Sequence, residues 1–103
     1  MLEEKRNSIH KIIDTLLSIK IEEQKLLNQD QINYFIEFKK IIDNIADENS
    51  LDLIIENLVI TISDLLNKAD ALSKNISLQN RTFLENIDKY EETKDINNLF
   101  FNL

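Results

Sequence analysis

The sequence predicts an all-α protein, and three observations lead to that class. The chain of 103 residues contains no Gly and no Pro, so the residues that most often build hairpin turns and sharp connections are missing. Its apolar residues recur at alternating steps of three and four, the period of an amphipathic helix. A chain of this length builds only one small core. We therefore expect a single helical domain over residues 1–103.

The first expected helix covers residues 3–46. Asn and Asp near residues 28–31 only mildly disfavour a helix, so we expect the chain to continue through them without a break. Tyr34, Phe35 and Phe38 fall on or close to the apolar stripe and are expected in the core. The stripe itself consists of Ile9, Ile12, Leu16, Ile19, Leu26, Phe35, Phe38, Ile42 and Ile45.

A turn at residues 47–50 separates this helix from a second one over residues 51–93. The polar run Asp47-Glu48-Asn49-Ser50 interrupts the apolar period. Ser50 is a good N-cap, and Asp52 suits the positive end of the helix dipole. The second stripe consists of Leu51, Ile55, Leu58, Ile62, Leu65, Ala69, Leu72, Ile76, Phe83, Ile87 and Tyr90.

Two such helices would form a long antiparallel hairpin, and some of its apolar side chains would stay exposed without a partner. Each helix would be about 65 Å long at 1.5 Å per residue, and an isolated hairpin buries only one stripe of each. Pairing with a second copy into a four-helix bundle, as a homodimer, or with a different partner would supply the cover. The apolar tail over residues 95–103 either folds back onto the bundle or binds another molecule.

The residues that most chemistry requires are missing. The chain has no Cys and a single histidine, His10, which leaves no thiolate site, no histidine metal cluster and no Ser-His-Asp set. Without Gly there is no glycine-rich phosphate loop. We therefore expect a protein that is not an enzyme and holds no cofactor or metal.

Charge and hydropathy exclude some classes of binding partner. The net charge of −7 argues against nucleic acid and against an anionic membrane surface, since both attract clustered Lys and Arg. No apolar run approaches the roughly 20 residues that span a bilayer. Charged residues interrupt the first apolar positions, so no signal peptide is expected. These features predict a cytoplasmic protein with a protein partner and no membrane insertion.

The negative charge is concentrated between Ile41 and Asn67, where no Lys or Arg occurs. A solvated acidic surface that keeps the protein soluble explains this stretch, and so does a docking surface for a basic partner. The carboxylates are Asp43, Asp47, Glu48, Asp52, Glu56 and Asp64.

Polar residues interrupt the second stripe at Gln79-Asn80-Arg81. A buried Asn80 could set helix register, as Asn does in coiled coils. The polar break could instead be a recognition patch in a groove, where a client helix lies along Phe83, Leu84 and Ile87. Both explanations stay open at this point.

Two segments resemble the flagellar export chaperones of the FlgN type. The first is "LLSIKIEEQKLLNQDQINYFIEFKKIIDNI". The second half of the family carries Leu-Asn-x-x-Asn-x-x-Leu-Leu near a helix end. Here Asn80 keeps the second Asn and Ser77 replaces the first. Residues that match the first pattern are Glu23, Leu26, Leu27, Asp30, Phe35, Lys39, Ile42 and Ile45.

The resemblance implies a small cytoplasmic chaperone that captures an amphipathic terminal helix of hook-associated subunits before export. The family usually continues into a flexible tail with an aromatic residue, a part that Phe100 or Phe101 would take here. The implied partner-binding residues are Ile76, Asn80, Phe83, Leu84, Ile87, Phe100 and Phe101.

Two other functions fit the same pattern. A helical immunity or antitoxin-like protein would bind a basic toxin through its acidic end, between Asp43 and Asp64. A structural coiled-coil protein without a soluble client would account for the sustained heptads.

Overall fold

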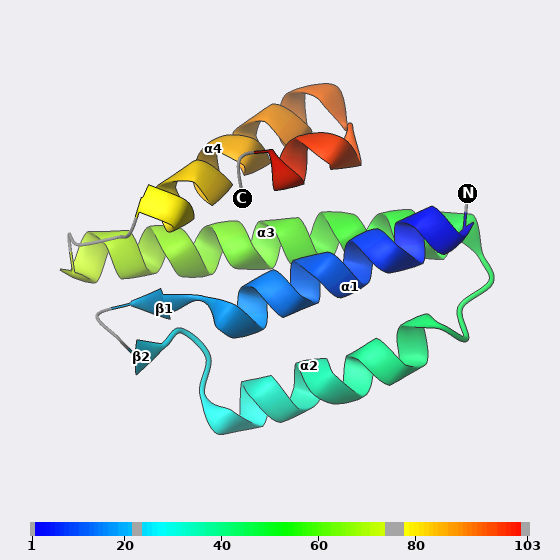
Figure 1. Cartoon of the computed structure of the whole chain (residues 1–103), viewed down its shortest axis with the longest axis horizontal. Coiled ribbons are helices and arrows are strands. Elements are labelled where there is room, and N and C mark those ends of the chain that lie inside the picture. Colours follow the sequence, from blue (N-terminus) through cyan, green and yellow to red (C-terminus); the bar gives the residue numbers. More distant parts are fainter. Residues whose placement is uncertain (1, 22–23, 74–77, 102–103) are drawn as a thin grey trace.

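The structure is all-α, as the sequence predicts, but the residues that it describes form four α-helices rather than two (Figure 1). It is a computed structural model that describes residues 2–21, 24–73 and 78–101. The elements in chain order are α1 (Leu2–Ser18), β1 (Lys20–Ile21), β2 (Gln24–Lys25), α2 (Gln29–Ile42), α3 (Glu48–Ser73), α4 (Leu78–Thr93) and the 3-10 helix η1 (Ile96–Phe100).

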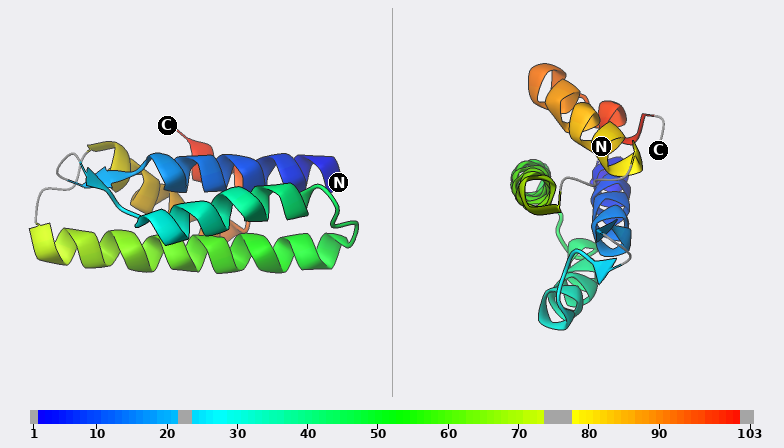
Figure 2. Two further views of the ribbon diagram at one scale, coloured as in Figure 1. Left: turned by 90° about the horizontal axis from the view of Figure 1, so that it is seen from below. Right: turned by 90° about the vertical axis from the view of Figure 1, so that its left-hand side faces the viewer.

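Helix α3 is the long axis of the molecule. Its 26 residues extend about 39 Å, close to the longest dimension of 40 Å. Helix α1 packs along it, with α2 and α4 on opposite sides of α1 (Figure 1). Viewed end-on, α4, α1 and α2 form a row, and α3 lies against one side of that row (Figure 2).

The single helix expected over residues 3–46 is wrong, because α1 ends at Ser18 and α2 begins at Gln29. Between them β1 pairs with β2, with Lys20 opposite Lys25. A capping box starts α2: the Gln31 N–H donates to Asn28 Oδ1 and the Asn28 N–H donates to Gln31 Oε1, both at 2.9 Å. Asn followed by Gln three residues later is a sequence signature of a helix start, and it marks this break.

The second expected helix, over residues 51–93, also divides. Helix α3 starts at Glu48 because the Asp47 carboxylate accepts from the Ser50 hydroxyl (2.8 Å) and the Asn49 N–H (3.3 Å). Helix α3 ends at Ser73, and α4 returns along it in the opposite direction (Figure 1). The molecule is therefore 40 Å long rather than the expected 65 Å or so.

The chain reverses again after α4. Lys94 has a φ of 55°, and its N–H donates to the Tyr90 carbonyl at 2.6 Å. This left-handed position ends many helices and is usually occupied by Gly, which this chain lacks. Helix η1 then folds back on α4, and Leu99 is fully buried. The described part of the tail thus covers the bundle.

The core follows most of the expected stripes. Ile12, Leu16, Ile42, Leu51 and Ile62 are all fully buried, as expected. The expectation that all three α2 aromatics lie in the core is wrong, however. Phe35 is buried, Phe38 is half-buried, and the Tyr34 side chain is 62% exposed. The cause is the orientation of α2, whose buried face is centred on Phe35 and Ile42.

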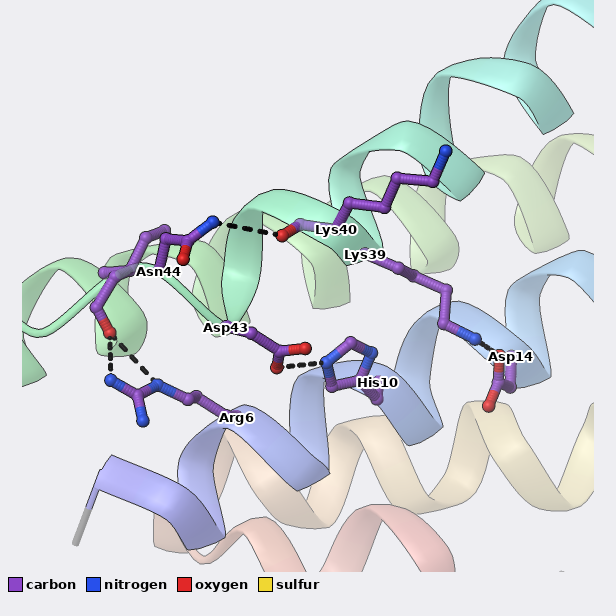
Figure 3. A network of polar contacts seen from close by, with 8 residues as sticks. Arg6, His10, Asp14, Lys39, Lys40, Asp43 and Asn44 are labelled. Atoms are coloured by element: carbon purple, nitrogen blue, oxygen red, sulfur yellow. Dashed lines mark hydrogen bonds and ion pairs between the residues drawn. The ribbon is translucent and has the colours of Figure 1, made fainter.

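Polar contacts fasten α1 to α2 along one side (Figure 3). Arg6, His10 and Asp14 are four residues apart and therefore share one face of α1. The Arg6 guanidinium donates to the Ile45 carbonyl at 2.6 and 3.1 Å. His10 Nε2 lies 2.9 Å from Asp43 Oδ1, and the Lys39 ammonium pairs with Asp14. These contacts tie α2 and the residues just after it to α1.

Candidate partner-binding site

Most of the partner-binding residues predicted on α4 are part of the protein's own core. Phe83 and Ile87 are buried on the inner face of α4, and Leu84 packs half-buried against the core. Asn80 is also buried, and its Nδ2 donates to the carbonyl of Lys20, 60 positions earlier, at 3.4 Å. This placement is the one that a structural role for Asn80 requires. Ile76 lies outside the described residues.

The two predicted aromatics of the tail differ in exposure. Phe100 is half-buried, and the Lys11 ammonium lies 5.3 Å from its ring centroid. Phe101 is 57% exposed, with the Lys89 ammonium 5.4 Å from its ring centroid. The structure thus places both rings beside cations of this chain, and their role toward a partner stays a prediction.

Basic residues from distant parts of the chain reach the acidic stretch. Lys5 of α1 pairs with Asp52 at 2.7 Å and with Glu48 at 3.0 Å. Hydrogen bonds to Asp52 first, and then to Glu48, raise the pKa of the Lys5 ammonium. Asp43 contacts His10, and Asp47 caps α3. A segment without Lys or Arg in the sequence therefore acquires its counter-charges through the fold.

Glu56, one turn after Asp52 on α3, contacts residues at and just after the C-terminal end of α4. It accepts from the Tyr90 hydroxyl at 3.1 Å and pairs with the Lys94 ammonium at 3.0 Å. Burial, and then the hydrogen bond to Glu56, raises the pKa of Tyr90 to about 12. Hydrogen bonds to Glu91 and Glu56 raise the pKa of Lys94. Five of the six carboxylates between Ile41 and Asn67 thus have a described partner.

An open apolar groove of about 350 Å³ lies between α2 and α3. Its lining carries no charge. The Tyr34 ring stacks on Phe38, with centroids 6.0 Å apart and planes at 12°, and meets Phe35 edge-on at 5.3 Å. The lining residues are Tyr34, Phe35 and Phe38 of α2 and Ile54, Asn57, Leu58 and Thr61 of α3.

Exposed apolar side chains extend this groove along both helices. Ile41 lies seven residues after Tyr34 and therefore on the same face of α2, with about half of its side chain exposed. On α3, Leu53 is one turn before the lining residue Asn57 and is 65% exposed. We name the groove lining with Ile41 and Leu53 the α2–α3 apolar surface. In the sequence, this surface is marked by three aromatic residues within five positions. The inner face of one short helix cannot bury all three.

Neither a metal site nor a membrane-spanning helix is found in the described ranges 2–21, 24–73 and 78–101. There, no three or more His, Cys, Asp and Glu side chains gather as a metal site would require. Within the same ranges, no helix is both long and apolar enough to cross a bilayer. The α2–α3 apolar surface is therefore the candidate functional site.

No family model, curated protein or solved structure matches this chain. The resemblance to the flagellar export chaperones stays a prediction. The candidate site rests on the shape and chemistry of the α2–α3 apolar surface.

Proposed function

We propose that this chain is a binding protein without enzymatic activity, and that it holds an amphipathic helix of a protein client on the α2–α3 apolar surface. The exposure of Tyr34 and Leu53 beside an uncharged groove carries this proposal. Contiguous exposed apolar side chains on a small protein commonly mark an interaction site. Aromatic residues such as those of α2 are also enriched among the side chains that dominate binding energy.

A helix can lie between α2 and α3 and contact the apolar side chains of both. Helix α2 has 14 residues, which corresponds to about 21 Å or four helical turns. A client helix of that length presents apolar side chains at positions i, i+3 or i+4, and i+7 along one face. Such a helix would lie between α2 and α3 and cover Tyr34 and Leu53.

More specifically, we propose that the chain is a cytoplasmic secretion chaperone. It would keep a flagellar hook-associated or filament-type subunit soluble before export. The resemblance over Leu16–Ile45 and around Asn80 supports this form. The client would bind α2–α3 rather than the set predicted on α4, because Asn80, Phe83 and Ile87 already pack inside the protein.

The two alternatives have less support. Docking of a basic toxin needs carboxylates that are free to pair with it, and five of the six in the acidic stretch already have partners in the described chain. A structural coiled coil needs one continuous stripe, and that stripe is divided between α3 and α4.

Co-purification from the native cell with a groove variant tests the proposal. In Tyr34→Ser/Leu53→Ser both replaced side chains are more than half exposed, so the fold should survive, as circular dichroism would verify. Leu78→Ser is the matched control, because Leu78 is 81% exposed on α4, away from the groove. We expect wild type and control to recover and solubilise the same helical client, and the double variant to lose it. Equal recovery by all three proteins would contradict the proposal.

A further inference from the structure

Asp64 lies on α3 about one turn beyond Thr61, the last α3 residue in the lining of the α2–α3 groove. It follows the lining residue Thr61 by three positions, so the two side chains are neighbours on α3. Asp64 is exposed, and no hydrogen bond or ion pair engages its carboxylate within the described part of the chain. Lys68, one turn further along α3, forms no ion pair with it there. Asp64 also borders a smaller hollow between α3 and α4, beside the exposed Ile60.

The position of Asp64 contrasts with that of the other carboxylates in the acidic stretch. Asp43, Glu48, Asp52 and Glu56 pair with cationic or ring nitrogens of α1 or of the segment after α4, and Asp47 caps α3. The fold thus satisfies these five internally. Asp64, which it leaves without a described partner, is about one turn of α3 from the groove lining.

We infer that the client helix is basic on one flank and that a Lys or Arg of that flank pairs with Asp64. This inference rests on the proposed function, and it specifies the chemistry of the occupant. The uncharged lining would receive the apolar face of the helix, and Asp64 would select its polar flank. Charge complementarity of this kind mainly raises the association rate and fixes the register of the bound partner.

The charge of the chain disfavours a second copy as the occupant. Each copy carries a net charge of −7, so two copies repel each other at low ionic strength. A symmetric contact through this face would also bring the Asp64 carboxylate of each copy to the same interface, with no Lys or Arg among the groove-lining residues to pair with it. A basic helix would be attracted by this negative charge, whereas a second copy would be repelled by it.

Two designed peptides of 14 residues, with the same Leu and Ile stripe and with flanks of either Lys or Glu, test the inference. Fluorescence anisotropy would measure their binding to wild type, Asp64→Lys and the control Glu92→Lys, which makes the same charge change on an exposed position of α4. We expect wild type to prefer the Lys peptide, and Asp64→Lys to weaken that complex by about fivefold. The preference should shrink as salt screens the charges, and Glu92→Lys should bind as wild type does.

The outcomes separate this inference from the proposed function. If both peptides bind wild type equally and Asp64→Lys changes neither, the inference fails while the groove remains a binding site. The Tyr34→Ser/Leu53→Ser variant would then still weaken both peptides. If neither peptide binds, the groove itself is not a helix-binding site. Self-association of wild type that the groove variant abolishes would identify a second copy as the occupant and overturn the inference.

Discussion

At the scale of single residues, a buried asparagine determines how the C-terminal part of the chain packs. Asn86 lies on the inner face of α4, and its Nδ2 donates to the carbonyls of Leu99 at 3.2 Å and Phe101 at 2.7 Å. An apolar side chain at this position would leave the Leu99 carbonyl without that donor. Asn86 thus fixes the fold-back of η1, which the apolar pattern of the tail left undecided.

Replacement of Asn86 by Ala should lower the free energy of unfolding by about 2–3 kcal/mol, because two hydrogen bonds are lost at a buried site. Asn98→Ala is the control, since the bond from Asn98 to the Thr93 hydroxyl is exposed, and its cost should be about 1 kcal/mol or less. Urea unfolding followed by circular dichroism measures both. Equal losses in the two variants would show that Asn86 does not anchor η1.

Tyr90 should make the protein sensitive to alkali. Its pKa is about 12 in the folded chain against an ordinary value of 10, so the folded state holds the phenolic proton more tightly. The resulting stabilisation is complete below pH 10 and disappears as the pH rises through 12. Urea unfolding at pH 9 and pH 11 should therefore show a larger loss for wild type than for Tyr90→Phe. Parallel losses would mean that the hydroxyl does not titrate differently on folding.

At the scale of elements, the Asn28–Gln31 capping box starts α2. Asn28→Ala removes the acceptor for the Gln31 N–H and should cost about 1 kcal/mol. Asn33→Ala, in the interior of the same helix, should be neutral or slightly stabilising, because Ala has the higher helix propensity. Thermal unfolding of the two variants compares them directly. A loss at Asn33 as large as that at Asn28 would argue against the cap as the cause of the break.

The same element shows why part of the candidate site escaped prediction. The stripe analysis correctly placed Phe35 and Ile42 toward the core, because helical period is a local property of the sequence. It misplaced Tyr34, because the packing of α2 against other helices buries the face that carries Phe35 and Ile42 and leaves Tyr34 outside it. One short helix cannot bury aromatics on two faces against a single neighbour.

At the scale of the whole molecule, the bundle is short, with dimensions of 40 × 32 × 19 Å and a Cα radius of gyration of 13.6 Å. Small-angle X-ray scattering at low protein concentration should give a radius of gyration near this value plus a hydration layer. A hairpin of two continuous helices would instead be about 65 Å long. A maximum dimension of that size would show that α1 joins α2, and α3 joins α4, in solution.

Periodicity and composition by themselves determined that this protein is helical, that most residues of its apolar stripes face inward, and that its net charge is negative. These properties follow from residues a few positions apart. Only the tertiary structure decided where the helices reverse, which carboxylates receive counter-charges, and which aromatics stay exposed. Each of these depends on residues far apart in sequence, such as Lys5 with Asp52 and Asn80 with Lys20. Local patterns carry no information on such pairs. For this reason the sequence predicted the site on α4, whereas the structure favours the groove between α2 and α3.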